Sequence, residues 1–354
     1  MAVPALRTPC GDGLGLAVCP ALGLLVTSNS DDDTLSVFDL PARDTAFINR
    51  PGGDTGMQRV CTLGGPGSPL PLQFRFNYFS GWMAFSCGAV PTVPPLLLLV
   101  TEAGNNTVHV IDVVGQVHVG FVAAPGSIPG PRGVAARCSL VAVSVWKDLH
   151  SGDHTVRLFE GSGAVWTPLR VLGDGFGAPG RADGQLKYPH GLRFTGTGSR
   201  VVVADRGNDR LSVFAVGDGS FVKHIAMGLR APFDVEECEG GWLVACGASE
   251  TVEFVGSGDV VGRPTLGKPG RLDGEFDRPS ALGLVPGTGL VVRDSYNCRV
   301  QVFVTPDAIA MAAMSTARVG WMVAVVRAVR RRVLSTHPRA PPTRARRRRP
   351  VEGL

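Results

Sequence analysis

The sequence lacks the features that mark several large classes of protein. Its eight cysteines stand singly and never form a C-x-x-C pair, whereas zinc sites are usually built from closely spaced ligands. Residues 1–26 contain prolines, Asp12 and several glycines where a secretory signal needs a continuous apolar stretch. We therefore expect reduced, mostly buried cysteines in an intracellular protein, cytoplasmic or nuclear, without a disulfide framework or a zinc finger.

Charge is scarce and unevenly placed. Charged residues make up 18% of the 354 residues, below the ~25% of a typical globular domain. The net charge of +5 does not describe the chain as a whole. Residues 305–354 contain eleven arginines and two acidic residues, whereas the rest of the chain has a net charge of −4. Any electrostatic attraction to nucleic acid or to an anionic membrane therefore belongs to the tail.

Signals of catalysis and of nucleotide binding are missing as well. No G-x-S-x-G nucleophile elbow is present. The glycine-rich stretches 11–15 and 173–177 open no helix, so they are turns rather than phosphate loops. No helical period interrupts residues 13–304, which disfavours an α/β fold. The sequence predicts an all-β chain with no cofactor.

What is present is an internal repeat. The segment 172–214 returns in shorter form at 266–303, and the spacing from Gly180 to Pro189 equals that from Gly270 to Pro279. A strand–turn–strand pattern recurs six times, at 23–39, 97–112, 140–160, 200–215, 241–256 and 289–304. Each copy joins a valine/leucine run to an alternating segment through a polar turn, which is typical of a β-hairpin.

Further apolar runs flank these hairpins. One precedes each hairpin, at 13–18, 81–86, 132–136, 190–194, 233–236 and 280–285, and a fourth follows several of them, at 59–64, 117–123, 169–173 and 221–226. Four antiparallel strands in 40–50 residues, repeated around a centre, describe the blades of a propeller. We predict a six-bladed β-propeller of four-stranded antiparallel blades over residues 10–304, with long loops inserted where the repeat interval grows.

The clearest copies resemble NHL repeats. The resemblance rests on the glycine-rich lead-in, the Pro-x-Gly-Leu start and the hairpin Val-Ala-Asp-x-Gly-Asn-x-Arg-Leu-x-Val-Phe, best seen at 172–227 and 265–304. It weakens at 125–160, where the hairpin turn is longer, and at 229–255, where Cys246 and Glu250 replace the Asp and Asn. The resemblance implies six blades and the binding of protein or RNA. In relatives such propellers often supply substrate recognition to ubiquitin ligases, and this sequence contains no RING of its own.

The repeat pattern ends at residue 304. Residues 305–354 form a C-terminal basic extension that is first apolar and then Arg-rich, and we expect it to be partly helical or disordered. A membrane span over 308–326 is disfavoured because Arg318 lies at its middle. The run 344–349 is expected to be a solvated stretch, with contact to an anionic surface or to import machinery as the alternative. The last blade needs a closing strand, and residues 319–326 or those near 2–6 are the two candidates.

Two kinds of candidate site follow. The Asp205/Asn208 pair and its copy Asp294/Asn297 resemble metal ligands, but both residue types stabilise turns, and we assign them that role. Enzymes of this shape work at the mouth of the central channel, where this chain offers a set of candidate binding residues: Asp12, Arg132, His190, Asp234 and Ser280. Two carboxylates and a single histidine are too few for the calcium or zinc sites of propeller lactonases and lyases, so no metal is expected.

An aromatic segment is the other candidate. It contains Phe74, Arg75, Phe76, Tyr78, Phe79 and Trp82. As core it needs no explanation, and as an exposed patch it would suit a partner or single-stranded RNA. The sequence favours a non-catalytic scaffold that recognises a protein partner through propeller faces and loops, in a ubiquitin-ligase pathway if the resemblance extends that far. A metal-dependent hydrolase or lyase at the channel mouth is the first alternative, and RNA binding is the second.

Overall fold

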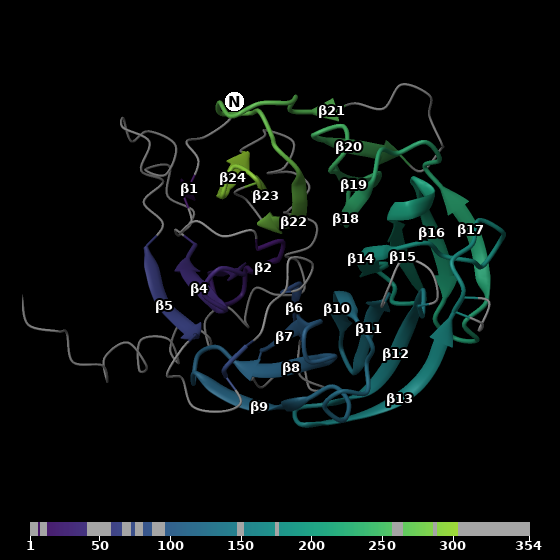
Figure 1. The fold of residues 1–354 in the computed structure, drawn as a ribbon, viewed down its shortest axis with the longest axis horizontal. Helices are drawn as coiled ribbons and strands as arrows, with labels where there is room; N and C mark the ends of the chain where they lie inside the picture. The colour runs from purple at the N-terminus through teal and green to yellow at the C-terminus, as the bar shows by residue number, and fades with distance from the viewer. Residues whose placement is uncertain are drawn as a thin grey trace, which may run out of the picture.

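Six four-stranded antiparallel sheets are arranged around a common axis (Figure 1). The computed structural model describes residues 6–7, 13–40, 58–65, 72–74, 81–86, 96–146, 152–173, 177–256, 265–285 and 289–303. Figure 1 shows the first strand of each sheet near the axis and the last at the rim. The chain is an all-β, six-bladed propeller, as predicted, and the described residues contain a single 3₁₀ turn (Arg206–Asn208) and no α-helix.

The strands follow the predicted repeat. Blade 1 holds β2 (Leu16–Cys19), β3 (Leu24–Asn29), β4 (Thr34–Asp39) and β5 (Arg59–Gly64); blade 2 holds β6 (Met83–Ser86), β7 (Leu97–Glu102), β8 (Thr107–Asp112) and β9 (Val117–Phe121). Blade 3 holds β10 (Pro131–Arg137), β11 (Leu140–Val145), β12 (Thr155–Ser162) and β13 (Val165–Leu172); blade 4 holds β14 (Pro189–Phe194), β15 (Arg200–Asp205), β16 (Arg210–Ala215) and β17 (Phe221–Ile225). Blade 5 holds β18 (Pro232–Cys238), β19 (Gly241–Cys246), β20 (Thr251–Gly256) and β21 (Thr265–Leu266); blade 6 holds β22 (Pro279–Val285), β23 (Gly289–Asp294) and β24 (Arg299–Phe303).

The start of the chain completes the last blade. Strand β1 (Leu6–Arg7) pairs antiparallel with β24, placing Leu6 opposite Val300 and Arg7 opposite Arg299. Of the two candidate closing segments, the N-terminal one is therefore the neighbour of β24, and residues 319–326 lie outside the described part. Joining the two ends of the repeat array in one sheet protects an edge that would otherwise expose its backbone groups.

The hydrophobic core is divided into six layers, one between each pair of neighbouring blades. One layer joins Leu158 of blade 3 to Leu192 and Phe214 of blade 4, and another joins Leu16 of blade 1 to Val291 of blade 6. The second strands are buried on both faces, which explains their continuous apolar runs. A blade must bury both faces, so each depends on its neighbours.

Four of the six inner strands share a distortion at their first residues. The register of strands β10, β14, β18 and β22 shifts directly after the proline that opens each strand. A bulge of this kind re-aims the following side chains. Directly after it, a Cβ on Gly133 would lie 2.3 Å from the carbonyl oxygen of His190, and one on Gly191 would lie 2.2 Å from Oδ1 of Asp234. Adjacent blades approach too closely here for most side chains.

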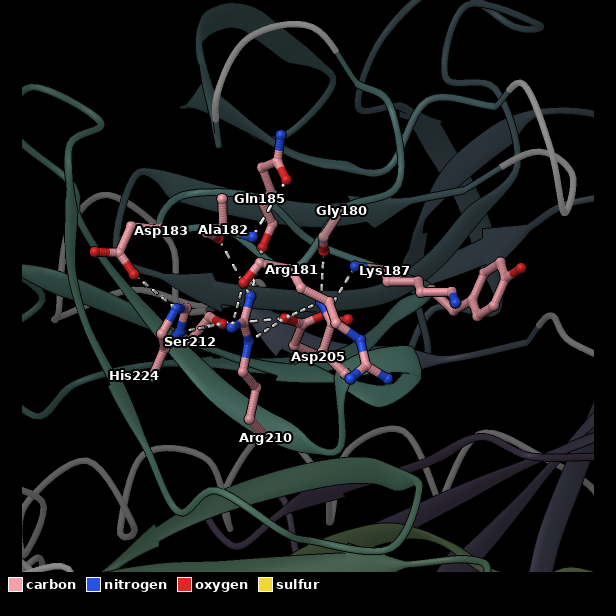
Figure 2. A network of polar contacts seen from close by, with 12 residues as sticks. Gly180, Arg181, Ala182, Asp183, Gln185, Lys187, Asp205, Arg210, Ser212 and His224 are labelled. Atoms are coloured by element: carbon pink, nitrogen blue, oxygen red, sulfur yellow. Dashed lines mark hydrogen bonds and ion pairs between the residues drawn. The ribbon is translucent and has the colours of Figure 1, made fainter.

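A buried ionic network explains the repeat signature of blade 4 (Figure 2). The Asp205 carboxylate is fully buried at the end of β15, where its Oδ1 accepts the Lys187 N–H at 2.7 Å. Its Oδ2 accepts Asn208 Nδ2 at 2.9 Å and Arg210 Nε at 2.8 Å. The Ser212 hydroxyl donates to the same oxygen at 3.3 Å.

The same network holds the glycine-rich lead-in loop in place. Asn208 Nδ2 also donates to the Gly180 carbonyl at 2.7 Å. The Arg210 guanidinium donates to three loop carbonyls, those of Arg181 (2.8 Å), Ala182 (3.4 Å) and Gln185 (2.9 Å). The loop forms two backbone hydrogen bonds of its own, from Gly180 to Leu186 and from Gln185 to Ala182. The fixed guanidinium fork supplies donors to further loop carbonyls. We call the Asp–Asn–Arg group and its bonds to the lead-in loop the loop staple.

Blade 6 repeats the loop staple almost atom for atom. Asp294 accepts Asn297 at 2.9 Å and Arg299 Nε at 2.7 Å. The Arg299 guanidinium donates to the carbonyls of Arg271 (2.8 Å), Leu272 (2.7 Å) and Glu275 (2.9 Å). The paired Asp and Asn positions of the sequence therefore have a structural role, as expected, but they bind the lead-in loop and the arginine and not the backbone of their own turn.

Replacing Arg210 by methionine should destabilise the protein strongly. The change keeps the side-chain volume but leaves the Asp205 carboxylate buried without its ion-pair partner, which typically costs about 3–5 kcal/mol. We expect that loss in the free energy of unfolding measured by urea titration, and a similar loss for Arg299→Met. The double variant Asp205→Leu/Arg210→Met should recover part of it, because no buried charge remains.

The control is Arg181→Met, because the Arg181 side chain is exposed and only its carbonyl joins the staple. It should change stability by less than about 0.5 kcal/mol. Equal losses for Arg181→Met and Arg210→Met would contradict a specific role of the network.

Candidate functional site

The inner strands place the predicted channel residues at two different positions. Arg132, His190 and Ser280 each follow the opening proline of their strand, on β10, β14 and β22. Asp234 is one residue further along β18, at the position of Gly133 in blade 3. The blade 5 counterpart of His190 is therefore Phe233, and Asp12 lies outside the described residues.

Asp234 is directed sideways into the next blade. Its Oδ2 accepts the Leu282 N–H of β22 at 2.9 Å, and its Oδ1 accepts the Val235 N–H at 2.9 Å. Burial raises the pKa of this carboxyl to about 6, against an opposing effect of the Arg193 charge. The carboxylate fastens blade 5 to blade 6, and its burial keeps it away from solvent.

Hydroxyl and guanidinium groups fasten other blades in the same way. Ser280 Oγ donates to the Leu14 carbonyl at 2.9 Å, which joins blade 6 to blade 1. Ser144 Oγ donates to the His190 carbonyl at 2.6 Å, which joins blade 3 to blade 4. The fully buried Arg293 donates through Nε to the Gly13 carbonyl at 2.9 Å. These polar side chains of the inner layer hold the ring together.

His190 is enclosed by aromatic rings. The centroid of its imidazole lies 5.0 Å from that of Phe233, 5.7 Å from Trp146 and 6.1 Å from Trp82. Its Nδ1 donates to the Tyr188 carbonyl at 3.0 Å, which fixes that ring nitrogen as the protonated one. Burial, together with nearby arginine charges, lowers the pKa of His190 well below its usual range, so the ring is neutral at physiological pH.

Three arginines surround this aromatic group. The guanidinium carbon of Arg132 lies 4.2 Å from the Trp146 centroid, and those of Arg206 and Arg278 lie 4.8 and 5.8 Å from the Phe233 centroid. The charges of the same three arginines act on His190. We define the axial cluster as Arg132, Trp146, His190, Arg206, Phe233 and Arg278.

Sequence reasoning found only two members of the axial cluster, Arg132 and His190. The others occupy repeat positions that differ between blades. Trp146 and Arg206 directly follow the second strand of their blades, and Arg278 precedes the proline that opens β22. An unusual residue at a position that is otherwise similar among the blades was the signal that could have indicated these members of the cluster. The sequence spacing does not show that these positions lie close together in the folded protein.

The aromatic segment is only partly described. Phe74 and Trp82 are buried, and Phe74 packs edge-on against His109 with centroids 5.1 Å apart. Arg75, Phe76, Tyr78 and Phe79 lie outside the described residues. Phe74 belongs to the core layer between blades 1 and 2, and Trp82 belongs to the layer between blades 6 and 1, beside His190.

Blade 2 contains a second buried histidine group, away from the axial cluster. His109 Nε2 lies 2.8 Å from Glu102 Oε2, and its Nδ1 lies 3.2 Å from His118 Nε2. Burial and the neighbouring His109 lower the pKa of His118 to about 4. Glu102 stands where blade 4 has Asp205, and Asn105, which donates to it at 2.9 Å, stands where blade 4 has Asn208, but Thr107 occupies the arginine position.

Metal ligation finds no support in the described part of the chain. No group of three or more His, Cys, Asp or Glu side chains among these residues has an arrangement that could hold a metal ion. No disulfide joins any two of the six cysteines that the structure describes, which are Cys19, Cys61, Cys138, Cys238, Cys246 and Cys298.

Comparison with known proteins does not extend these observations. A scan against protein-family models matches none of them, and a search of curated proteins finds no match. The six-bladed propeller is thus established by the structure, while the NHL resemblance rests on the repeat motifs. Across the described ranges, no helix has the length and apolar character needed to cross a membrane.

The raised pKa of Asp234 predicts a pH effect on stability. Between pH 4 and 6 the unfolded chain ionises this carboxyl while the folded protein keeps it protonated, so wild-type stability falls as pH rises. Relative to Asp234→Asn, the wild type should lose up to about 3 kcal/mol of unfolding free energy across this window. Urea titrations from pH 4 to 7.5 measure the difference, with the exposed Glu239→Gln as control. Parallel curves for wild type and Asp234→Asn would show that the carboxyl titrates normally.

Proposed function

We propose that this propeller is a non-catalytic binding module that recognises a protein partner through its axial end, where the inner strands begin. Propellers of this kind are commonly protein-binding scaffolds. The observation that supports the proposal is that the polar side chains of the inner layer are already occupied in holding the blades together. Asp234, Ser280 and Arg293 bond to the backbone of neighbouring blades, and His190 is a fully buried, neutral ring.

Catalysis would require these groups to meet a substrate. A general acid or base must come within hydrogen-bond distance of the reacting proton. The His190 ring has no exposed surface, and Asp234 is directed toward β22. A hydrolase or lyase at the channel mouth therefore lacks its reactive groups among the described residues, and binding is favoured.

The axial end also has the composition of a recognition surface. Arg278 and Tyr296 are stacked at 4.2 Å, and Tyr296 is 39% exposed. Arginine and aromatic residues are enriched at protein interfaces, where they contribute much of the binding energy. We place this protein inside the cell, and we propose that it serves as the recognition part of a larger assembly, for which a ubiquitin-ligase pathway is the specific hypothesis.

Metal titration separates the scaffold from the enzyme alternative. Isothermal titration of the purified protein with Ca²⁺ and with Zn²⁺ should show no stoichiometric binding, because Asp234 and Ser280 are engaged between blades. Tight one-to-one binding that disappears in Asp234→Asn would contradict the scaffold proposal and favour a metal-dependent hydrolase or lyase.

Partner capture tests the proposal directly. The tagged full-length protein should retain at least one protein in stoichiometric amount from extracts of its own cells, measured by quantitative mass spectrometry. The variant Lys187→Glu/Arg230→Glu, at the axial end, should lose that protein by roughly tenfold or more if the contact resembles an interface hot spot. Arg200→Glu/Lys223→Glu is the matched control, because Arg200 begins β15 at the opposite end and Lys223 lies on the outer strand β17. Equal retention by wild type and the axial variant would reject this end as the interface.

A further inference from the structure

We propose that the axial cluster binds an acidic segment of the protein partner, with carboxylates held by Arg132, Arg206 and Arg278. This inference rests on the proposed protein-binding function and assigns its site and the chemistry of its partner. Three guanidiniums are connected to one buried imidazole through two rings, Trp146 and Phe233. Arginines from three different blades thus converge on one point of the axial end.

The rings hold the arginines in position before any ligand arrives. A guanidinium stacked on an aromatic face is attracted by the ring electrons and loses conformational freedom. Trp146 and Phe233 are 6% and 1% exposed, so they form a rigid floor. Pre-organised arginine forks lose little entropy when they bind a carboxylate in a bidentate manner.

Positive charge gathers at this place. Arg206 and Arg278 lie over the same Phe233 ring, at 4.8 and 5.8 Å from its centroid. Burial lowers the pKa of the Arg132 guanidinium to about 10. Guanidiniums gathered around two neighbouring rings attract a carboxylate by Coulomb interaction, and this attraction is strongest where water is scarce.

A carboxylate fits the cluster better than RNA does. Single-stranded RNA is bound by exposed rings on which the bases stack and by a basic track along the backbone. Here Arg132 covers Trp146, Arg206 covers Phe233, and both rings are buried. The chain up to residue 304 carries a net charge of −4, which disfavours a long polyanion. The positive charge is compact, as a short acidic segment requires.

Photo-crosslinking tests the inference on the full-length protein. The probe is a ten-residue (Glu-Gly)₅ peptide with a benzophenone at one end, and (Gln-Gly)₅ is the neutral comparison. We expect crosslinks of the Glu peptide to the segments around Tyr188, Arg206 and Tyr296, with yields roughly tenfold above those of the Gln peptide, as expected for one or two charge-assisted hydrogen bonds. Crosslinks to the Arg-rich residues 305–354 are counted separately as an internal reference.

Charge-matched variants decide whether the site is specific. Arg206→Gln/Arg278→Gln should reduce the axial crosslinks by roughly tenfold and leave those to residues 305–354 unchanged. Arg181→Gln/Arg271→Gln removes the same charge from exposed side chains of the lead-in loops and should change the axial yield less than about twofold. Thermal unfolding of each variant confirms that the fold is intact.

Three results would overturn the inference. The first is an equal axial yield from the two peptides, and the second is an equal loss in both double variants. The third is stronger axial crosslinking by a benzophenone-labelled ten-nucleotide uridine strand, which would assign the cluster to RNA. If partner capture succeeds while the Glu peptide fails, the protein-binding function stands and only its acidic chemistry is wrong.

Discussion

The loop staple is the interaction on which the regular blades depend. A propeller blade enters its innermost strand through a long loop, and this loop must run beside buried strands although its own backbone is irregular. In blade 4 the buried Asp205 neutralises Arg210, and Arg210 then satisfies loop carbonyls that no strand can reach. The arrangement is stable because each of its charged groups has several partners, whereas a lone buried charge would be strongly unfavourable.

The other blades show what happens when the staple changes. Blade 2 replaces it with Glu102, Asn105 and His109. In blade 5, Cys246 stands at the aspartate position, and the fourth strand shrinks to the two residues of β21. The clean copies of the motif therefore share a physical feature, a buried aspartate–arginine pair at the end of the second strand, which blades 2 and 5 do not have.

The side chains of the inner layer have two roles: some hold neighbouring blades together, and others form the proposed binding surface. Asp234, Ser144 and Ser280 bond between blades, and the N-terminal strand β1 closes the sixth sheet. A ring fastened at both its axis and its ends keeps its axial end rigid. Rigidity of this kind lets arginines from separate blades stay close together in the unbound protein, which is the condition for recognising a compact anion.

The sequence by itself determined the blade count, the strand order and a structural role for Asp205 and Asn208, because strand alternation and polar turn residues are local properties that repeat along the chain. It also limited the closing strand to two candidates. Only the tertiary structure decided that β1 closes the ring, that Asp234 serves a blade contact, and that Arg206 and Arg278 share the Phe233 ring. Those facts depend on how six blades meet around one axis, and residues as far apart in the sequence as Leu6 and Val300 become neighbours only after the ring has closed.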